Sequence, residues 1–336
     1  LGQVILVVNC GLNYFFQDII NTCFSAVGSN DDELMFHGVE TLTIAISSIE
    51  YDTELTKLLF EKLIEYLQQT NKQEMLEQIL SAISSLLDAN GENLIQYIPK
   101  YISFFVNIAR ADSMFKGRAL EALAKMISYA PNNLSMDVIN VSLQMLISAI
   151  DLNDSSIFSD LLNGFSSLVN RKNQLLQSSL PKLIDFATGI IFNNQFGVCI
   201  SYGEEEDDEL IFEKQADCLI NAISLLDEIL LENPKILEPK FASNLFDSLS
   251  SFLENMTSSL GIQKIVSILT TIVQVYELDP NDFLEKISFL FEECEFSYVQ
   301  AIFECITNLI KKDANLNTYT YKNICKVCCN ALNRKL

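Results

Sequence analysis

The chain of 336 residues contains no tryptophan, a single histidine, only 11 glycines and only 6 prolines. With one histidine, a Ser-His-Asp or Cys-His site would have to be built on His37. That residue lies in the helical stretch ELMFHGVETL, which has no nucleophile motif beside it. We interpret His37 as a histidine on a helix surface or at a seam between repeats. No glycine-rich loop that could hold a phosphate occurs either. The sequence therefore predicts a protein that is not an enzyme and that needs no cofactor.

Basic residues are scarce as well. The 22 Lys and Arg residues stand against 44 Asp and Glu, which gives a formal net charge of −22. Such a field repels nucleic acid and anionic membranes and attracts basic segments of other proteins. No uninterrupted apolar run reaches the length of a membrane-spanning helix. We therefore expect a partner that is neither nucleic acid nor membrane, and that carries positive charge.

The nine cysteines are odd in number, irregularly spaced and mostly flanked by apolar residues, which is typical of reduced, buried thiols in an intracellular protein. The segment Cys325-x-x-Cys328 resembles half of a zinc site, but no second pair of ligands follows it. Cys325, Cys328 and Cys329 have the i, i+3, i+4 spacing of one helix face, which predicts a buried face and no metal. The chain opens on LGQVILVVNCGL, inside an apolar pattern and without a signal peptide, so we expect a fragment of a longer cytosolic or nuclear protein.

Almost every segment carries apolar residues at helical spacing, and the segments repeat. The stretch 81–104 aligns with 163–186 at an offset of 82, which places Pro99-Lys100 on Pro181-Lys182. Half of 82 is 41, the length of a two-helix repeat of the HEAT type. A third copy at 221–246 has Pro239 in the same place. The sequence predicts an all-α fold, a right-handed α-solenoid of HEAT repeats with about eight helix pairs, running as one body and as a monomer over 1–336.

Local signals mark where the helices begin. Proline fits the first turn of the second helix in each pair, because the amide groups there have no partner within the helix. Helix starts are predicted at three stretches that combine capping residues with acidic residues in the first turn: Asp31-Asp32-Glu33, Asn153-Asp154-Ser155-Ser156 and Asp279-Pro280-Asn281-Asp282.

Six acidic residues in one unbroken run interrupt the repeat. The third copy lies 58 residues after the second, so an insertion of about 17 residues relative to the 41-residue period is required. We assign it to an inserted acidic loop at 195–208. Adjacent carboxylates cannot be buried unpaired, so we expect the run to be exposed. Its members are Glu204, Glu205, Glu206, Asp207, Asp208 and Glu209.

The second helices of the pairs carry polar stripes along one face. In HEAT solenoids the second helix lines the concave side, so these stripes predict one inner surface rich in acids and amides. Such a groove suits an extended basic peptide, because carboxylates pair with Lys and Arg while amides hold the peptide backbone. The candidate contacts are Glu61, Glu65, Asn107, Asp137, Asn140, Gln144 and Asp151.

The ordered set of features resembles the importin-β family of karyopherins, closest to the importin five (karyopherin β-3) branch. The resemblance is carried by the stretch from KLIEYLQQ to YISFFVNI, by the helix start at Gly117-Arg118 with Glu121, and by the acidic insertion followed by Glu213-Lys214. It covers about residues 30–250 in order, with the shorter insertion and the absence of tryptophan as departures.

The resemblance implies a nuclear import receptor that shuttles between cytoplasm and nucleus. Such a receptor wraps Lys-rich localisation signals of its cargo on the second helices, and it works with the Ran GTPase and nucleoporins. A HEAT scaffold or regulatory subunit of another complex would share the fold and the charge, and fold alone does not separate the two.

Overall fold

The computed structural model describes residues 16–292, apart from 30, 49–52, 112–113, 153, 194–205, 255, 257 and 288, together with a few isolated positions after 292. For 206–216 it describes the backbone only. The chain divides into two compact units, Leu1–Leu176 (unit 1) and Gln177–Leu336 (unit 2). Every regular element in the described part is helical, so the fold is the predicted all-α helical repeat. The continuity of one solenoid over 1–336 stays a prediction.

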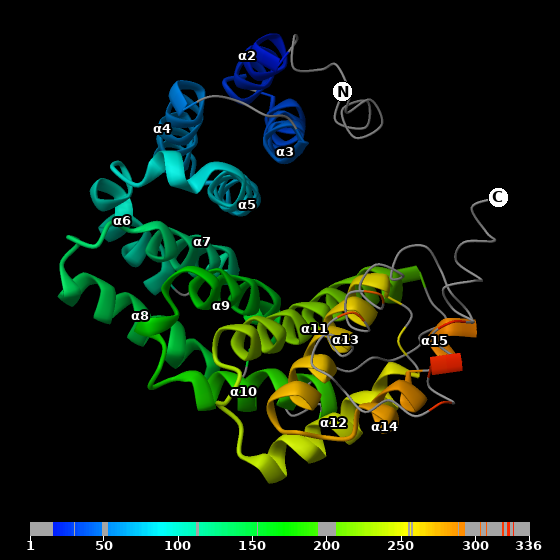
Figure 1. Cartoon of the computed structure of the whole chain (residues 1–336). Coiled ribbons are helices and arrows are strands. Elements are labelled where there is room, and N and C mark those ends of the chain that lie inside the picture. The colour runs from blue at the N-terminus through cyan, green and yellow to red at the C-terminus, as the bar shows by residue number, and fades with distance from the viewer. Residues whose placement is uncertain are drawn as a thin grey trace. The chain divides into compact units, whose positions relative to one another are not determined.

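Unit 1 consists of two layers of helices (Figure 1). One layer holds α3 (Asp32–Ser48), α5 (Gln73–Asn90), α7 (Lys116–Tyr129) and α9 (Phe158–Lys172), which pack on one another in sequence. We call it the first-helix row. The other layer holds α4 (Thr53–Gln69), α6 (Ile98–Arg110) and α8 (Met136–Ile150), and α2 (Phe16–Val27) packs on α3. We call α4, α6 and α8 the second-helix layer.

The helices of unit 1 bury apolar faces that they cannot cover alone. Helix α7 is the extreme case, because every residue from Ala119 to Tyr129 is buried between its neighbours. It packs most closely on α9, with Gly164 of α9 so near that a Cβ there would lie 2.8 Å from Cβ of Ala124. Helices α4 and α6 pack on α5 and α7, the first helices of the pairs that follow them. Each interface is thus a contact between neighbours in the repeat, as expected for a solenoid.

Unit 2 repeats the same arrangement. Its helices are α10 (Leu180–Thr188), α11 (Glu206–Glu232), α12 (Pro239–Leu253), α13 (Ser259–Val275), α14 (Pro280–Lys286) and α15 (Phe289–Glu292). Helix α11 packs on α13, α10 packs on α11, and α12 packs on α13. Short 3-10 or π turns occur in the chain at Gly91–Leu94, Ser155–Ile157, Asn173–Leu175 and Gly189–Asn193.

The predicted helix starts are confirmed where the sequence signal was local. Asp31 Oδ1 accepts hydrogen bonds from the amides of Glu33 and Leu34, at 3.1 and 3.2 Å. Asp154 and Asp279 cap their helices in the same way. Pro99, Pro181 and Pro239 lie in the first turn of α6, α10 and α12. Each proline therefore stands where its missing N–H costs no hydrogen bond.

The end of the acidic loop was predicted too late in the chain. Helix α11 begins at Glu206, so Glu206, Asp207 and Asp208 belong to its first turn and not to the loop 195–208. Carboxylates are favoured there because the first turn presents unpaired amides and the positive end of the helix dipole. Glu204 and Glu205 lie outside the described residues, and so do the side chains of the rest of the run.

The cysteine prediction holds in part. Cys23 and Cys218 are buried free thiols, and burial raises the pKa of Cys23 to about 11. Cys325 is exposed, so the prediction that it lies on a buried face is wrong. Tyr321 and Lys322, four and three positions earlier, are exposed too. Cys328 and Cys329 lie outside the described residues.

Candidate functional site: the second-helix layer of unit 1

The predicted contact residues lie on the second-helix layer, and nearly all of them are open to solvent. Glu61 of α4 is half-buried. Glu65 of α4 and Asn107 of α6 are exposed, and so are Asp137, Asn140 and Gln144 of α8 and Asp151, which follows α8. The stripes repeat because apolar positions three and four apart turn inward and leave the intervening positions outside.

We expected the second helices to line the concave side, but the packing of the helices within each layer does not favour this. The first helices pack tightly along their row, whereas α6 and α8 touch only lightly. In a curved two-layer stack the inner layer is the more tightly packed one, because its helices lie on the shorter arc. Within unit 1 the packing thus favours the first-helix row as the inner side and leaves the polar stripes on the more open layer.

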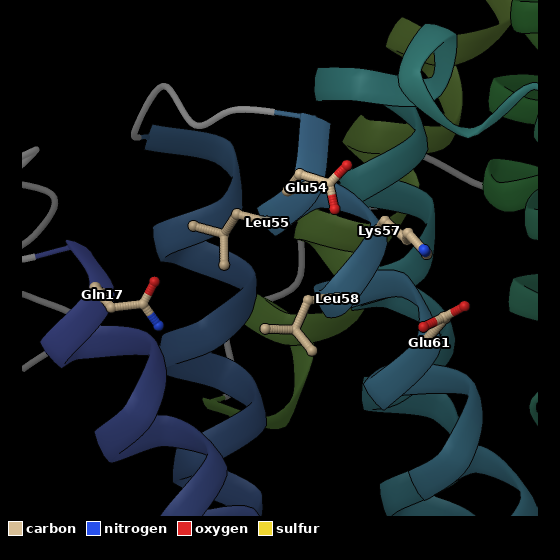
Figure 2. Close-up of a pocket in the computed structure, with 6 residues that line it drawn as sticks. All are labelled: Gln17, Glu54, Leu55, Lys57, Leu58 and Glu61. Carbon is tan, nitrogen blue, oxygen red and sulfur yellow. The ribbon is translucent and has the colours of Figure 1, made fainter.

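A pocket of about 470 Å³ opens at the start of α4, lined by Gln17, Glu54, Leu55, Lys57, Leu58 and Glu61. We call it the α4 pocket. Figure 2 shows Leu55 and Leu58 on the side of α4 that faces α2, while Lys57 and Glu61 point to the other side. Leu58 is 42% exposed, so it contributes apolar surface to the pocket. The pocket combines apolar surface with carboxylates.

Lysines weaken the α4 pocket as a binder of basic ligands. Lys57 lies 5.1 Å from the ring centre of Tyr97, and its pKa is raised by the Tyr97 side chain first and by the Glu61 carboxylate after it. Lys100 also feels the Glu61 charge, and Lys62 binds Glu65 at 2.7 Å. A lysine from a partner would compete with these residues for Glu61 and Glu65.

Helix α8 offers a polar surface without competing lysines. It contains no Lys or Arg, and Asp137, Asn140 and Gln144 are exposed on it. Beside them lie Met136 and Val141, 54% and 44% exposed. We call these five residues the α8 face. Its acid and amide tips stand next to apolar side chains, a combination that fits a ligand with both a charge and an aliphatic stem.

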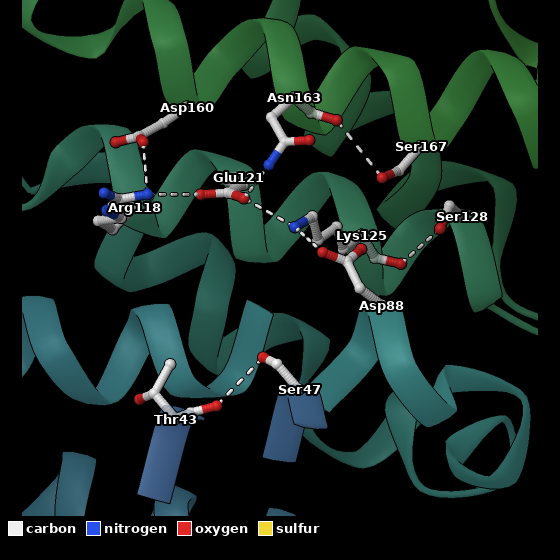
Figure 3. A network of polar contacts seen from close by, with 10 residues as sticks. All are labelled: Thr43, Ser47, Asp88, Arg118, Glu121, Lys125, Ser128, Asp160, Asn163 and Ser167. Carbon is white, nitrogen blue, oxygen red and sulfur yellow. Dashed lines mark hydrogen bonds and ion pairs between the residues drawn. The ribbon is translucent and has the colours of Figure 1, made fainter. Parts of the chain in front are cut away.

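The first-helix row carries a polar network that no sequence stripe predicted (Figure 3). Lys125 Nζ of α7 lies 2.7 Å from Glu121 Oε1 and binds Asp88 of α5 as well. Asn163 of α9 donates to the same Glu121 oxygen at 2.6 Å. Arg118 joins Glu121 to Asp160, at 3.2 and 2.8 Å. We call these six residues the α7 network.

Burial sets the ionisation of the α7 network. Burial alone would lower the pKa of Lys125, but the Glu121 and Asp88 carboxylates outweigh it, so the pKa is raised. Burial raises the pKa of Asp160 to about 7, and Arg118 counters this shift without cancelling it. Sequence reasoning noted Arg118 and Glu121 only through the family resemblance. The signal that could have found the network is a charged pair placed inside an otherwise apolar helix.

The same kind of pair recurs in unit 2. Lys264 of α13 binds Asp227 of α11 at 2.9 Å, and Asp227 is 2% exposed. Asp88 and Lys125 are 37 residues apart, and so are Asp227 and Lys264. We call them the Asp–Lys pairs. Each ties one first helix to the next, so they act on the stacking of repeats.

Other candidate chemistry is weak in the described part of the chain. His37 is exposed and lies 3.0 Å from Glu40, which confirms that it is a helix-surface histidine. Among the described residues no group of three His, Cys, Asp or Glu side chains is placed to hold a metal ion. No described helix is long and apolar enough to cross a membrane.

Comparisons with known proteins add little to this geometry. No family model matches the chain, and no curated protein matches it. Among solved structures, an engineered protein from the Northeast Structural Genomics Consortium has 16% sequence identity and a TM-score of 0.42, covering 76% of this chain and 98% of its own. A second engineered protein from the same consortium has 12% identity and a TM-score of 0.43, covering 77% and 97%. The chain is therefore described by its own geometry, as an all-α helical-repeat protein.

Proposed function

We propose that the chain is a helical-repeat receptor that binds Lys-rich segments of other proteins on the second-helix layer of unit 1, in the manner of a nuclear import receptor. The α8 face carries the proposal, because it exposes acids, amides and apolar side chains together on a helix without a cation. On the importin-β resemblance, its further partners would be the Ran GTPase and nucleoporins, and it would shuttle between cytoplasm and nucleus.

A Lys-rich peptide has three features that match the α8 face. Its ammonium groups can pair with Asp137, its backbone can bond to the amides of Asn140 and Gln144, and its aliphatic stems can cover Met136 and Val141. Exposed charge pairs contribute only about 0–1 kcal/mol each, so affinity must come from several contacts at once. The net charge of −22 raises the encounter rate with a cationic segment.

The first test is fluorescence anisotropy of a labelled Lys-rich peptide with the full chain. Asn140→Ala combined with Gln144→Ala should weaken binding, since the backbone contacts are lost. Gln174→Ala with Asn244→Ala removes one exposed amide of each kind elsewhere and should leave it unchanged. Asp137→Lys should weaken binding more than Asp185→Lys, which makes the same charge change on α10. Equal effects within each pair would refute the α8 face.

A second test separates an import receptor from another scaffold. The intact protein would be immobilised with a Lys-rich cargo, and RanGTP would be added. Release of the cargo by RanGTP, and not by RanGDP, is the expected result for a receptor of the importin-β type. Retention of the cargo in both cases would favour a scaffold, whatever the outcome of the peptide titrations.

A further inference from the structure

A second pocket, of about 690 Å³, lies in unit 1 at the end where α7 and α9 finish. Its lining includes Tyr129, Asn132, Asn170, Arg171 and Lys172, together with Glu92 and Ile95. We call it the Arg171 pocket. None of these residues belongs to the second-helix layer, so the pocket is separate from the proposed receptor surface.

The polar tips in the Arg171 pocket are mostly hydrogen-bond donors. Arg171 supplies a guanidinium and Lys172 an ammonium, and Lys172 donates to Asn132 Oδ1 at 2.9 Å. That bond engages Asn132 Oδ1, and the Asn132 amide N–H groups are further donors at the pocket. Asn170 adds another exposed amide. A site with this many donors suits a ligand that is rich in acceptors and negatively charged.

Arg171 is held in place before any ligand arrives. Its guanidinium carbon lies 4.0 Å from the ring centre of Tyr129, and Tyr129 is only 6% exposed. The ring is in turn fixed by Gly91, where a Cβ would come within 2.5 Å of two ring atoms. Stacking on a fixed ring orients the planar fork of an arginine, which reduces the entropy lost when it binds a carboxylate.

The chain's own Glu92 shows which group Arg171 receives. Its carboxylate lies 3.3 Å from Nη1 of Arg171, although the Glu92 side chain is 75% exposed. The other carboxylate near Arg171, Asp88, is bound by Lys125. An exposed pair of this kind is weak, so an incoming carboxylate can share or replace Glu92. Ile95, which is 37% exposed, adds apolar surface beside the charge.

We propose that the Arg171 pocket binds an acidic segment of a partner protein, with an Asp or Glu carboxylate seated against Arg171 and Lys172. The chain would then have two docking surfaces of opposite preference. The second-helix layer would bind a basic segment, and this pocket would bind an acidic one. The net charge of −22 repels an acidic peptide, so general electrostatic attraction cannot produce this binding.

The test is anisotropy of a short fluorescein-labelled peptide of alternating Glu and Ser, with a Gln–Ser peptide as its uncharged control. The full chain should bind the first and not the second. Arg171→Gln with Lys172→Gln should weaken binding about tenfold or more, the loss expected for charge-assisted hydrogen bonds. Lys235→Gln with Lys240→Gln makes the same charge change at exposed sites in unit 2 and should have little effect.

A further variant separates a built pocket from charge alone. Arg171→Lys keeps the charge but loses the planar fork and its stacking on Tyr129, so binding should weaken several-fold. Circular dichroism of each variant checks that the helices are intact. The proposal is overturned if the unmodified chain does not bind the acidic peptide, if both double variants have equal effects, or if Arg171→Lys binds as well as the unmodified chain. None of these outcomes depends on whether a Lys-rich peptide binds at α8.

Discussion

Replacing Lys125 by methionine should destabilise unit 1 strongly. The Lys125 and Glu121 side chains are 2% and 3% exposed, and they lie 2.7 Å apart. Methionine has a similar length and no charge, so the substitution leaves the Glu121 carboxylate buried with one cation fewer. Breaking a buried pair in this way costs about 3–5 kcal/mol. Because Arg118 and Asn163 still bind Glu121, we expect the lower end, about 3 kcal/mol.

The assay is thermal unfolding followed by calorimetry and circular dichroism. For a unit of this size, about 2–4 °C is lost for each kcal/mol, so the transition of unit 1 should fall by about 6–12 °C. Lys62→Met is the matched control, because it breaks the exposed pair with Glu65 and should give no measurable shift. Adding Glu121→Gln to Lys125→Met should recover part of the loss, since the buried charge is then gone.

The result that would refute the reasoning is a similar shift for Lys125→Met and Lys62→Met. It would mean that water reaches Glu121 and that the α7 network is not a buried one. A further loss on adding Glu121→Gln would also contradict the account, because it would show that the Glu121 carboxylate, bound only by Arg118 and Asn163, still stabilises the fold.

Three more predictions concern unit 1. The pKa of Asp160 is raised from 3.8 to about 7, so the folded unit holds a proton that the unfolded chain releases, and this group lowers stability as pH rises between those values. Asp160→Asn should therefore gain stability relative to the unmodified chain between pH 5 and pH 8 in urea titrations, and a relative loss over that range would contradict the shift. Gly91→Ala should lower the free energy of unfolding by about 1–3 kcal/mol, because the new Cβ would overlap the Tyr129 ring. In the control Gly28→Ala the new Cβ would lie 3.3 Å from its nearest atom, so the loss should be smaller. Equal urea midpoints for the two variants would argue against the contact. Asp31→Ala should cost about 1 kcal/mol by removing the cap on α3, and Asp31→Ser should restore most of it; thermal melts in which the two variants are alike would speak against capping.

The sequence predicted well whatever depends on local spacing. The sequence is enough to place the helix caps at Asp31, Asp154 and Asp279 and the prolines of the second helices, because both depend on hydrogen-bonding groups within one turn. The exposed stripe on α8 follows from apolar positions three and four apart. The start of α11 was missed because acidic residues fit both a loop and a helix first turn.

Features that join distant helices could not be predicted in this way. The pair of Asp88 and Lys125 and the stacking of Arg171 on Tyr129 each join residues about one repeat apart, and their existence depends on how neighbouring helices are rotated. The exposure of Cys325 is a similar case, since the i, i+3, i+4 spacing does not say which face meets a neighbour. The spacing of the layers is also a property of the stack and not of any helix.

The Asp–Lys pairs restrict how repeats of this chain could be spliced to one another. Consider a recombinant in which the repeat of α5 and α6 is followed by the repeat that begins with α13, joined at equivalent positions. Asp88 would then stand 37 residues before Lys264, as Asp227 does, and the acid and the base could still pair. If the repeat that begins with α9 were joined in the same way, Ser166 would occupy the position of Lys125, because it stands 41 residues, or one repeat, after it. Asp88 would then lose its cation. The repeats are thus not interchangeable modules, and viable recombinants would be those whose joined helices keep the acid and the base in register.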